Sequence, residues 1–134
     1  MILSARLHVK GFETEQEGIP VNFCELHFSQ EVDRNGRPVS MVRGGIIKLS
    51  YASFDESDIL LWMVTNSAKN GKIEFLGVES SRSYRYIEFV DGMCVDYLET
   101  FVKDQEMKVE LSISAREVAV AGVSHLNVWP GYEE

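Results

Sequence analysis

Short alternations of apolar and polar residues run through most of this chain, and this pattern constrains the fold more than any other feature. Successive side chains of a β-strand point to opposite faces, so a period of two is typical of a strand with one buried face. The first such strand is predicted at Leu3–Val9. Further strands are predicted at Val21–Glu31, Ile46–Tyr51, Ile73–Phe75, Tyr84–Phe89, Val95–Tyr97, Lys108–Ser114 and Val118–Val120. The chain is therefore expected to be mainly β, with about eight short strands.

One segment has a helical pattern instead. Ser53-Phe54-Asp55-Glu56 matches a capping box, in which the serine and the glutamate satisfy free amides at a helix start. An apolar stripe at helical spacing follows, formed by Ile59, Leu60, Trp62, Met63 and Val64. Lys69 suits the last turn, and Asn70-Gly71 is a typical stop signal. We expect one helix here, with Trp62 in the core.

Asp91-Gly92 is a strong hairpin signal between two predicted strands. A two-residue loop would pair Phe89 with Cys94, whereas a three-residue loop would pair Phe89 with Val95. A slip of one residue exchanges the two faces of a strand. We therefore favour the longer turn, or a bulge with Gly92 at positive φ.

Full closure of a sheet with many short strands removes its exposed edges. The predicted architecture is a small antiparallel β-barrel with one flanking α-helix. With 134 residues, no internal repeat and no linker, the chain is expected to be a single domain spanning residues 1–134. The tail from His125 to Glu134 is too short to fold alone, so Trp129 needs a partner surface on its own barrel or on a neighbour.

A long loop separates the second and third predicted strands. Such loops exceed most hairpin connections and are usually functional or disordered. Val39, Met41 and Val42 are apolar anchors that argue against disorder. The loop is predicted to dock on a neighbouring subunit through turn-forming, basic and apolar residues, namely Asp33, Arg34, Gly36, Arg37, Pro38, Val42, Arg43, Gly44 and Gly45.

The charge balance argues against some partners. Lys and Arg total 13 against 21 Asp and Glu, a net charge of −8, whereas affinity for a phosphate backbone comes from Lys and Arg. Nucleic acid is therefore not an expected partner. The sequence has no apolar run of about 18 residues, so no membrane insertion is expected. The N-terminus runs directly into a strand pattern without a signal peptide, which predicts a protein made in the cytoplasm.

No set of residues points to catalysis. The three histidines lack metal-ligand spacing, and Cys24 and Cys94 lack a Cys-x-x-Cys partner. Both thiols are interpreted as small hydrophobic groups, and a nucleophilic Cys94 is disfavoured within a strand. Gly44-Gly45 lacks the frame of a phosphate loop and indicates a bulge or a close backbone approach. We expect no catalytic residue, no metal site and no cofactor.

The motifs of the chain, in their order and spacing, resemble the Hcp-like tube proteins of type VI secretion systems, and most of all the TssD branch of Bacteroidetes. The resemblance covers nearly the whole chain. It is carried by Gln30-x-x-Asp33-x-x-Gly36-Arg37-Pro38, Val42-Arg43-Gly44-Gly45, Leu61-Trp62-Met63, Asn70-Gly71-Lys72-Ile73, Phe89-x-Asp91-Gly92-x-Cys94-Val95-x-Tyr97 and His125-x-Asn127-x-Trp129.

The resemblance implies a structural, self-assembling protein rather than an enzyme. Family members form homohexameric rings that stack head-to-tail into a tube, and a contractile sheath drives this tube, with its tip spike and effector cargo, out of the cell. It implies that the segment from Asp33 to Gly45 contacts other subunits or rings. The acidic Phe12–Pro20 loop and the Trp-Pro-Gly-Tyr-Glu-Glu end depart from the expected pattern, which leaves open a specialised paralogue. The alternative is a stand-alone small barrel that binds a ligand or acts as a small enzyme, which would need a pocket of convergent polar groups.

Overall fold

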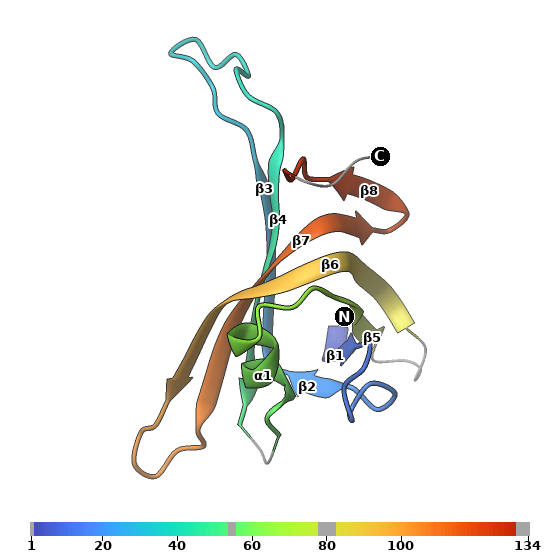
Figure 1. Cartoon of the computed structure of the whole chain (residues 1–134), viewed down its shortest axis with the longest axis vertical. Coiled ribbons are helices and arrows are strands. Elements are labelled where there is room, and N and C mark those ends of the chain that lie inside the picture. Colours follow the sequence, from blue (N-terminus) through green and yellow to red (C-terminus); the bar gives the residue numbers. More distant parts are fainter. Residues whose placement is uncertain (1, 54–55, 78–82, 131–134) are drawn as a thin grey trace.

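A computed structural model describes residues 2–53, 56–77 and 83–130 of the chain. It contains one helix and eight strands (Figure 1). The elements are β1 (Ile2–Val9), β2 (Ile19–Val21), β3 (Phe23–Ser29), β4 (Arg43–Ala52), α1 (Asp58–Val64), β5 (Lys69–Gly77), β6 (Ser83–Thr100), β7 (Lys108–Val120) and β8 (Val123–Leu126). The mainly β fold with one helix is confirmed. Phe54 and Asp55 of the predicted capping box, residues 78–82 and the last four residues lie outside the described residues.

All strands belong to one antiparallel sheet with the order β2-β1-β5-β6-β7-β4-β3, and β8 adds to β7. The two ends of this path, β2 and β3, follow each other in the chain and are separated by Asn22. The Asn22 amide donates to the carbonyl oxygen of Ser50 in β4, 2.8 Å away. The sheet therefore curls round on itself, and the predicted barrel takes the form of an open, curled sheet (Figure 1).

The core follows the alternation that the sequence predicts. Ile47, Leu49 and Tyr51 of β4 are buried, while the exposed Ile46 and Lys48 point to the opposite face. The other strands contribute in the same way, and the core cluster includes Leu7, Val9, Ile19, Ile73, Ile87, Phe89, Val109, Leu111, Ile113 and Val118. Burying each such side chain contributes about 1.5–3 kcal/mol, so these rows fix which face of the sheet is inside.

The helix is shorter than predicted at both ends. It begins at Asp58, and its N-cap Ser57 makes no capping hydrogen bond; instead, the Ile59 amide donates to Glu56 Oε2 at 3.4 Å. It ends at Val64, after which Asn66 adopts a φ of 50° and turns the chain. The predicted stop, Asn70-Gly71, lies inside β5. Gly71 is needed there because a Cβ at this position would collide with the backbone of β1 and the ring of Phe89.

Trp62 lies in the core, as predicted, and it attaches the helix to the sheet. Its ring stacks on Phe89 with centroids 6.1 Å apart and meets Phe12 edge-on at 6.0 Å. Its Nε1–H donates to the carbonyl oxygens of Ser67 (2.8 Å) and Gly92 (3.1 Å). The apolar stripe is narrower than predicted, because Ile59 and Trp62 are buried while Leu60, Leu61 and Val64 are exposed.

The hairpin predicted at Asp91-Gly92 is wrong, because β6 runs through it without a break from Ser83 to Thr100. Phe89 and Val95 therefore lie on one strand rather than facing each other. Asp91, not Gly92, has the positive φ (53°). Its carboxylate accepts from Arg116 Nε at 2.8 Å, and its amide donates to Asn70 Oδ1 at 2.9 Å. Neighbours on both sides thus stabilise an irregularity within the strand.

The C-terminal part holds a strand that the sequence pattern missed. β7 continues from Lys108 to Val120 as one element instead of two predicted strands. Ala121 and Gly122, both at positive φ, then reverse the chain into β8. His125 and Leu126, which begin the tail predicted to be too short to fold alone, belong to β8 and pair with β7.

Candidate functional site

The long loop between β3 and β4 projects beyond the sheet at one end of the molecule's longest axis (Figure 1). We call its residues, Gln30–Val42, the arm. The predicted site residues Asp33, Arg34, Gly36, Arg37, Pro38 and Val42 lie in the arm, whereas Arg43, Gly44 and Gly45 begin β4.

The end of the arm is held by Asp33. The Asp33 amide donates to the carbonyl oxygen of Arg37 at 2.9 Å, and the Gly36 amide donates to the carbonyl oxygen of Asp33 at 3.0 Å. The Asp33 side chain accepts from the amides of Asn35 (2.9 Å) and Arg37 (3.0 Å). Gly36 has a φ of 82°, a conformation that glycine adopts without steric cost. The turn chemistry read from the sequence therefore gives a defined, ordered turn.

Ser40 connects the two sides of the arm nearer to the body. Its Oγ accepts from the Glu31 amide at 2.9 Å, and its carbonyl oxygen accepts from Gln30 Nε2 at 3.3 Å. The Val39 amide donates to the carbonyl oxygen of Glu31 at 2.9 Å. The arm is thus a hydrogen-bonded hairpin rather than a loose loop.

The apolar side chains of the arm are exposed. Met41 is 66% exposed, and Val32, Val39 and Val42 are exposed as well. Val39, Met41 and Val42 are the anchors expected from the sequence, but no described part of the subunit body covers them. An ordered segment that presents apolar side chains to solvent is typical of a protein–protein contact.

The base of the arm is shaped by the two glycines. A Cβ on Gly44, at φ 125°, would collide with the backbone of His27 and Phe28, and one on Gly45, at φ 70°, would press on Val118. The ladder between β3 and β4 shifts register at this point. The predicted bulge or close approach at Gly44-Gly45 is confirmed.

Asn127 fastens the C-terminal segment to this base, and the sequence analysis did not single it out as a site residue. Its Nδ2 donates to the carbonyl oxygens of Gly44 (2.9 Å) and Ala115 (2.8 Å). His125 Nε2 lies 3.0 Å from Asn127 Oδ1, and the His125 ring meets Phe28 edge-on at 5.3 Å. The direction of the arm is therefore tied to the C-terminal segment.

A groove of about 690 Å³ lies between the arm and the C-terminal segment. The structure brings four predicted site residues together here, Val42, Arg43, Gly44 and Trp129. Arg34, Gly36 and Arg37, in the turn at the end of the arm, do not line this groove. The remaining lining is mixed: Val39, Met41, Ile46, Leu126 and Val128 are apolar, Ser40, Ser114 and Asn127 are polar, and Glu31 is acidic.

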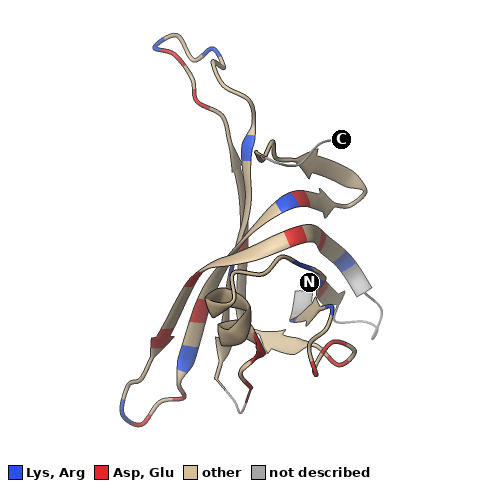
Figure 2. Cartoon of the chain, viewed as in Figure 1, with Lys and Arg blue, Asp and Glu red and all other residues tan. Residues whose placement is uncertain are grey.

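The arginines of the loop remain available. Arg34 and Arg37 lie in the turn, Arg43 lies at the base, and all three are exposed. Figure 2 shows basic segments with acidic ones near them towards the far end of the arm, and a further basic segment at its base. Within the described part of the chain, no salt bridge involves any of the three. Exposed arginines beside apolar residues suit a contact with carboxylates of another copy.

Two further surfaces are open to a partner. β3 pairs with β4 along one edge, and the half of β6 beyond Gly92 pairs with β7 alone. Among the described residues, no strand pairs with the opposite edges of these two segments. Phe23 on β3 and Val95 and Leu98 on β6 are exposed beside these edges. The alternation in the sequence predicts the strands but not which edges stay unpaired.

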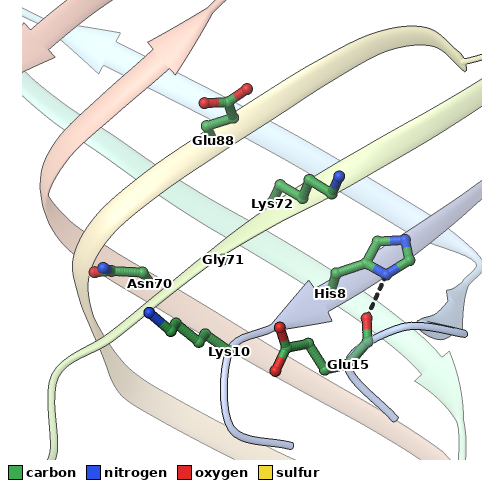
Figure 3. A pocket seen from close by; sticks show the side chains of 7 residues that line it. All are labelled: His8, Lys10, Glu15, Asn70, Gly71, Lys72 and Glu88. Carbon is green, nitrogen blue, oxygen red and sulfur yellow. Dashed lines mark hydrogen bonds between the residues drawn. The ribbon is translucent and has the colours of Figure 1, made fainter.

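A polar hollow of about 340 Å³ lies near the start of β5 (Figure 3). His8 Nδ1–H donates to the carbonyl oxygen of Glu15 at 2.7 Å, and His8 Nε2 lies 3.2 Å from Glu74 Oε1. Asn70 Oδ1 accepts from the Asp91 amide. These polar groups hold the acidic loop and β6 in place. Their role in the hollow is therefore structural. Among the described residues no group of His, Cys, Asp and Glu could hold a metal ion.

The cysteines behave as apolar groups. Burial raises the pKa of Cys24 and of Cys94 to about 11, so both remain protonated thiols at neutral pH. A thiol of this kind is a poor nucleophile. In the part of the chain that the structure describes, no helix has the length and apolar character needed to cross a membrane.

Comparison with known proteins agrees with this architecture. A family model described as hemolysin coregulated protein Hcp (TssD) matches residues 1–130. Comparison with curated protein sequences gave no match.

Several solved structures have the same fold. Hcp1 of Flavobacterium johnsoniae is 26% identical, with a TM-score of 0.83 over 93% of this chain and 100% of that one. Hcp1 of Salmonella typhimurium is 12% identical, with a TM-score of 0.72 over 88% of this chain and 85% of that one. The sheath/tube terminator of the PVC extracellular contractile injection system is 14% identical, with a TM-score of 0.63 over 90% of this chain and 94% of that one. Because the family model spans nearly the whole chain and the fold agrees, the chain belongs to the Hcp (TssD) family.

Proposed function

We propose that this protein is the structural subunit of a type VI secretion tube, which assembles into hexameric rings that stack head-to-tail. The observation that carries the proposal is the pair of unpaired strand edges on one sheet, combined with an ordered arm that exposes apolar side chains. Membership of the Hcp (TssD) family supports the same role.

The sheet itself favours a ring. Its segment β3-β4-β7-β6 contains an even number of antiparallel strands, so β3 and β6 run in opposite directions. When identical copies stand side by side in the same orientation, the free edge of β3 therefore meets the free edge of the next copy's β6 as an antiparallel pair. Such a contact joins two different surfaces, and it closes into a ring if the rotation between copies allows. Exposed edges are otherwise a liability for a soluble protein.

The arm supports the second step, the stacking of rings. It projects away from the curled sheet, and no described part of the subunit covers its exposed side chains. Within this proposal, the predicted interface residues on the arm and β4, together with Trp129, contact a copy in the adjacent ring. The sheath, the tip spike and effector cargo are the further partners, and the assembled tube leaves the producing cell.

The mass of the assembly tests this proposal. Light scattering on a sizing column should give about six times the 15.2 kDa of one chain, and negative-stain images of the peak should show rings. A clean monomer at high concentration would contradict the ring. It would favour the stand-alone barrel, for which ligand binding would then be the next measurement.

A further inference from the structure

The groove beside the arm is not filled by any described part of the same subunit. Its walls carry exposed apolar side chains, among them Val39, Met41 and Val128. Its charged lining residues are Glu31 and Arg43. Its volume of about 690 Å³ corresponds to roughly twenty water molecules at about 30 Å³ each, enough space for several side chains.

A segment of matching chemistry lies at the opposite end of the molecule. The turn between β6 and β7, residues Phe101–Met107, is called here the β6–β7 tip. Figure 1 shows this hairpin at the other end of the longest axis from the arm. Phe101 is 71% exposed, and Val102 and Met107 are exposed as well. The Gln105 amide donates to the carbonyl oxygen of Val102 at 3.1 Å, so the tip is an ordered turn.

The two surfaces also have complementary charges. The β6–β7 tip carries Lys103, Asp104 and Glu106, whereas the groove carries Glu31 and Arg43. All five residues are exposed. An apolar centre with opposite charges around it is the usual plan of a specific interface.

We propose that the β6–β7 tip of one copy docks into the groove beside the arm of a second copy. Phe101 is the apolar anchor, and Lys103 pairs with Glu31. The inference rests on the proposed tube, whose head-to-tail stacking brings these opposite ends of two copies together. It adds a defined contact, because the arm is then one wall of a receptor for the adjacent copy's hairpin. Large aromatic side chains in such pockets usually dominate binding.

Disulfide trapping tests the contact directly. A Met41→Cys, Val102→Cys double variant of the full chain is oxidised and analysed on a non-reducing gel. Docking of tip into groove joins two different surfaces, so the product should be a ladder of dimers, trimers and higher multimers. Each single variant alone should give no ladder, which shows that Cys24 and Cys94 do not account for it. Absence of a ladder in the double variant overturns the proposal.

Further substitutions in the Met41→Cys, Val102→Cys variant test whether Phe101 is the apolar anchor. Phe101→Ser should reduce the ladder about tenfold or more. The matched control is Val123→Ser, because Val123 is 73% exposed but lies outside the groove and the β6–β7 tip. Lys103→Glu and Glu31→Lys should each weaken the ladder, and their combination should restore it. Equal ladders in all these variants would contradict the specific contact.

The mass of the reduced protein separates this inference from the proposed function. Rings that give no ladder would overturn the docking contact alone. A monomer that gives no ladder would overturn both the docking contact and the tube. A monomer that still gives a ladder would support the docking contact and contradict the ring.

Discussion

At the scale of single residues, Asn127 connects three parts of the protein that are far apart in the sequence. Its side chain donates to Gly44 at the base of the arm and to Ala115 in β7. Its backbone amide donates to the carbonyl oxygen of Arg116 at 2.7 Å. A short asparagine side chain with both amide hydrogens committed has little freedom to move, so it fixes the arm relative to the sheet.

Replacing Asn127 should therefore loosen the arm. Asn127→Ala removes the donor to the carbonyl oxygens of Gly44 and Ala115, which we expect to cost about 1–3 kcal/mol of unfolding free energy. The melting temperature should fall by several degrees, since about 1 kcal/mol shifts a domain of this size by roughly 3–5 °C. The matched control is Asn35→Ala, because Asn35 is exposed in the turn of the arm. Equal melting temperatures for both variants and the native protein would show that Asn127 is not a structural link.

The two thiols, one half-buried and one buried, make stability depend on alkaline pH. The pKa of Cys24 and of Cys94 is raised from about 9 to about 11 in the folded state. Between these values the unfolded chain loses protons that the folded protein keeps. This contribution to stability is complete below about pH 9 and is lost as the pH rises towards about 11.

Chemical denaturation at pH 7, 9 and 10.5 measures this effect. The free energy of unfolding should fall between the last two values. It should fall less steeply in a Cys24→Ala, Cys94→Ala variant. Some fall should remain, because burial and the hydrogen bond to Glu56 also raise the pKa of Tyr51. Identical slopes in the two proteins would contradict the assigned role of the thiols.

The sequence could predict the conformation of Gly44 and Gly45 but not the target of Asn127. Paired glycines indicate a close backbone approach through local sterics alone. The direction of an asparagine amide depends on which distant carbonyls the fold places beside it. His125-x-Asn127-x-Trp129 stands out as a motif, yet nothing in its composition identifies Gly44 and Ala115 as partners.

At the scale of elements, α1 depends on the side chains that it buries, above all Trp62. A seven-residue helix has little stability of its own, because isolated helices need about 12–15 residues. Trp62 supplies the missing stability through its stacking on Phe89 and its hydrogen bonds to Ser67 and Gly92. The helix is therefore a consequence of tertiary packing more than of local propensity.

Trp62→Ala should destabilise the subunit by about 3–5 kcal/mol, the usual cost of deleting a large buried aromatic side chain. Leu61→Ala is the matched control on the same helix, because Leu61 is 56% exposed and its loss should cost well under 1 kcal/mol. Urea denaturation of the two variants measures both values. A small effect of Trp62→Ala would show that α1 is not held through this side chain.

The same region shows why two local signals misled the sequence analysis. Asp91-Gly92 and Asn70-Gly71 are typical of a hairpin and of a helix end. In the structure they lie on neighbouring strands, where the Asp91 amide binds Asn70 and Gly71 lets β1 approach. A residue at positive φ can form a bulge as well as a turn, and a glycine, which has no side chain, can allow two strands to approach closely. Only the tertiary partners decide between these uses.

At the scale of the whole molecule, the alternating pattern predicted the fold well. The rows of Ile47, Leu49 and Tyr51 and of Val109, Leu111 and Ile113 are buried as expected. The sequence did not predict β8 or the long unbroken β6 and β7. These features depend on which strands pair, and pairing between distant segments leaves no local trace. The interface residues assigned from the loop remain a prediction, because assembly is a property of several copies.

The arm gives a test at this scale. Arg43→Glu combined with Pro38→Asp should leave the subunit folded, since both residues are exposed. The variant should form rings, because the edges of β3 and β6 are unchanged, but it should not form tubes. Circular dichroism measures whether the subunit folds, light scattering measures whether rings form, and negative-stain imaging shows whether tubes form. Tubes of normal length would contradict the role of the arm.

The hydrogen bonds within the arm have a consequence for the speed and strength of assembly. Asp33 and Ser40 fix the shape of the arm before any partner is present. A loop that becomes ordered only on contact would lose conformational entropy at that moment, which weakens binding. Here that loss occurs once, during folding of the subunit. The arm thus arrives preorganised, so encounters between copies are limited by orientation rather than by loop closure.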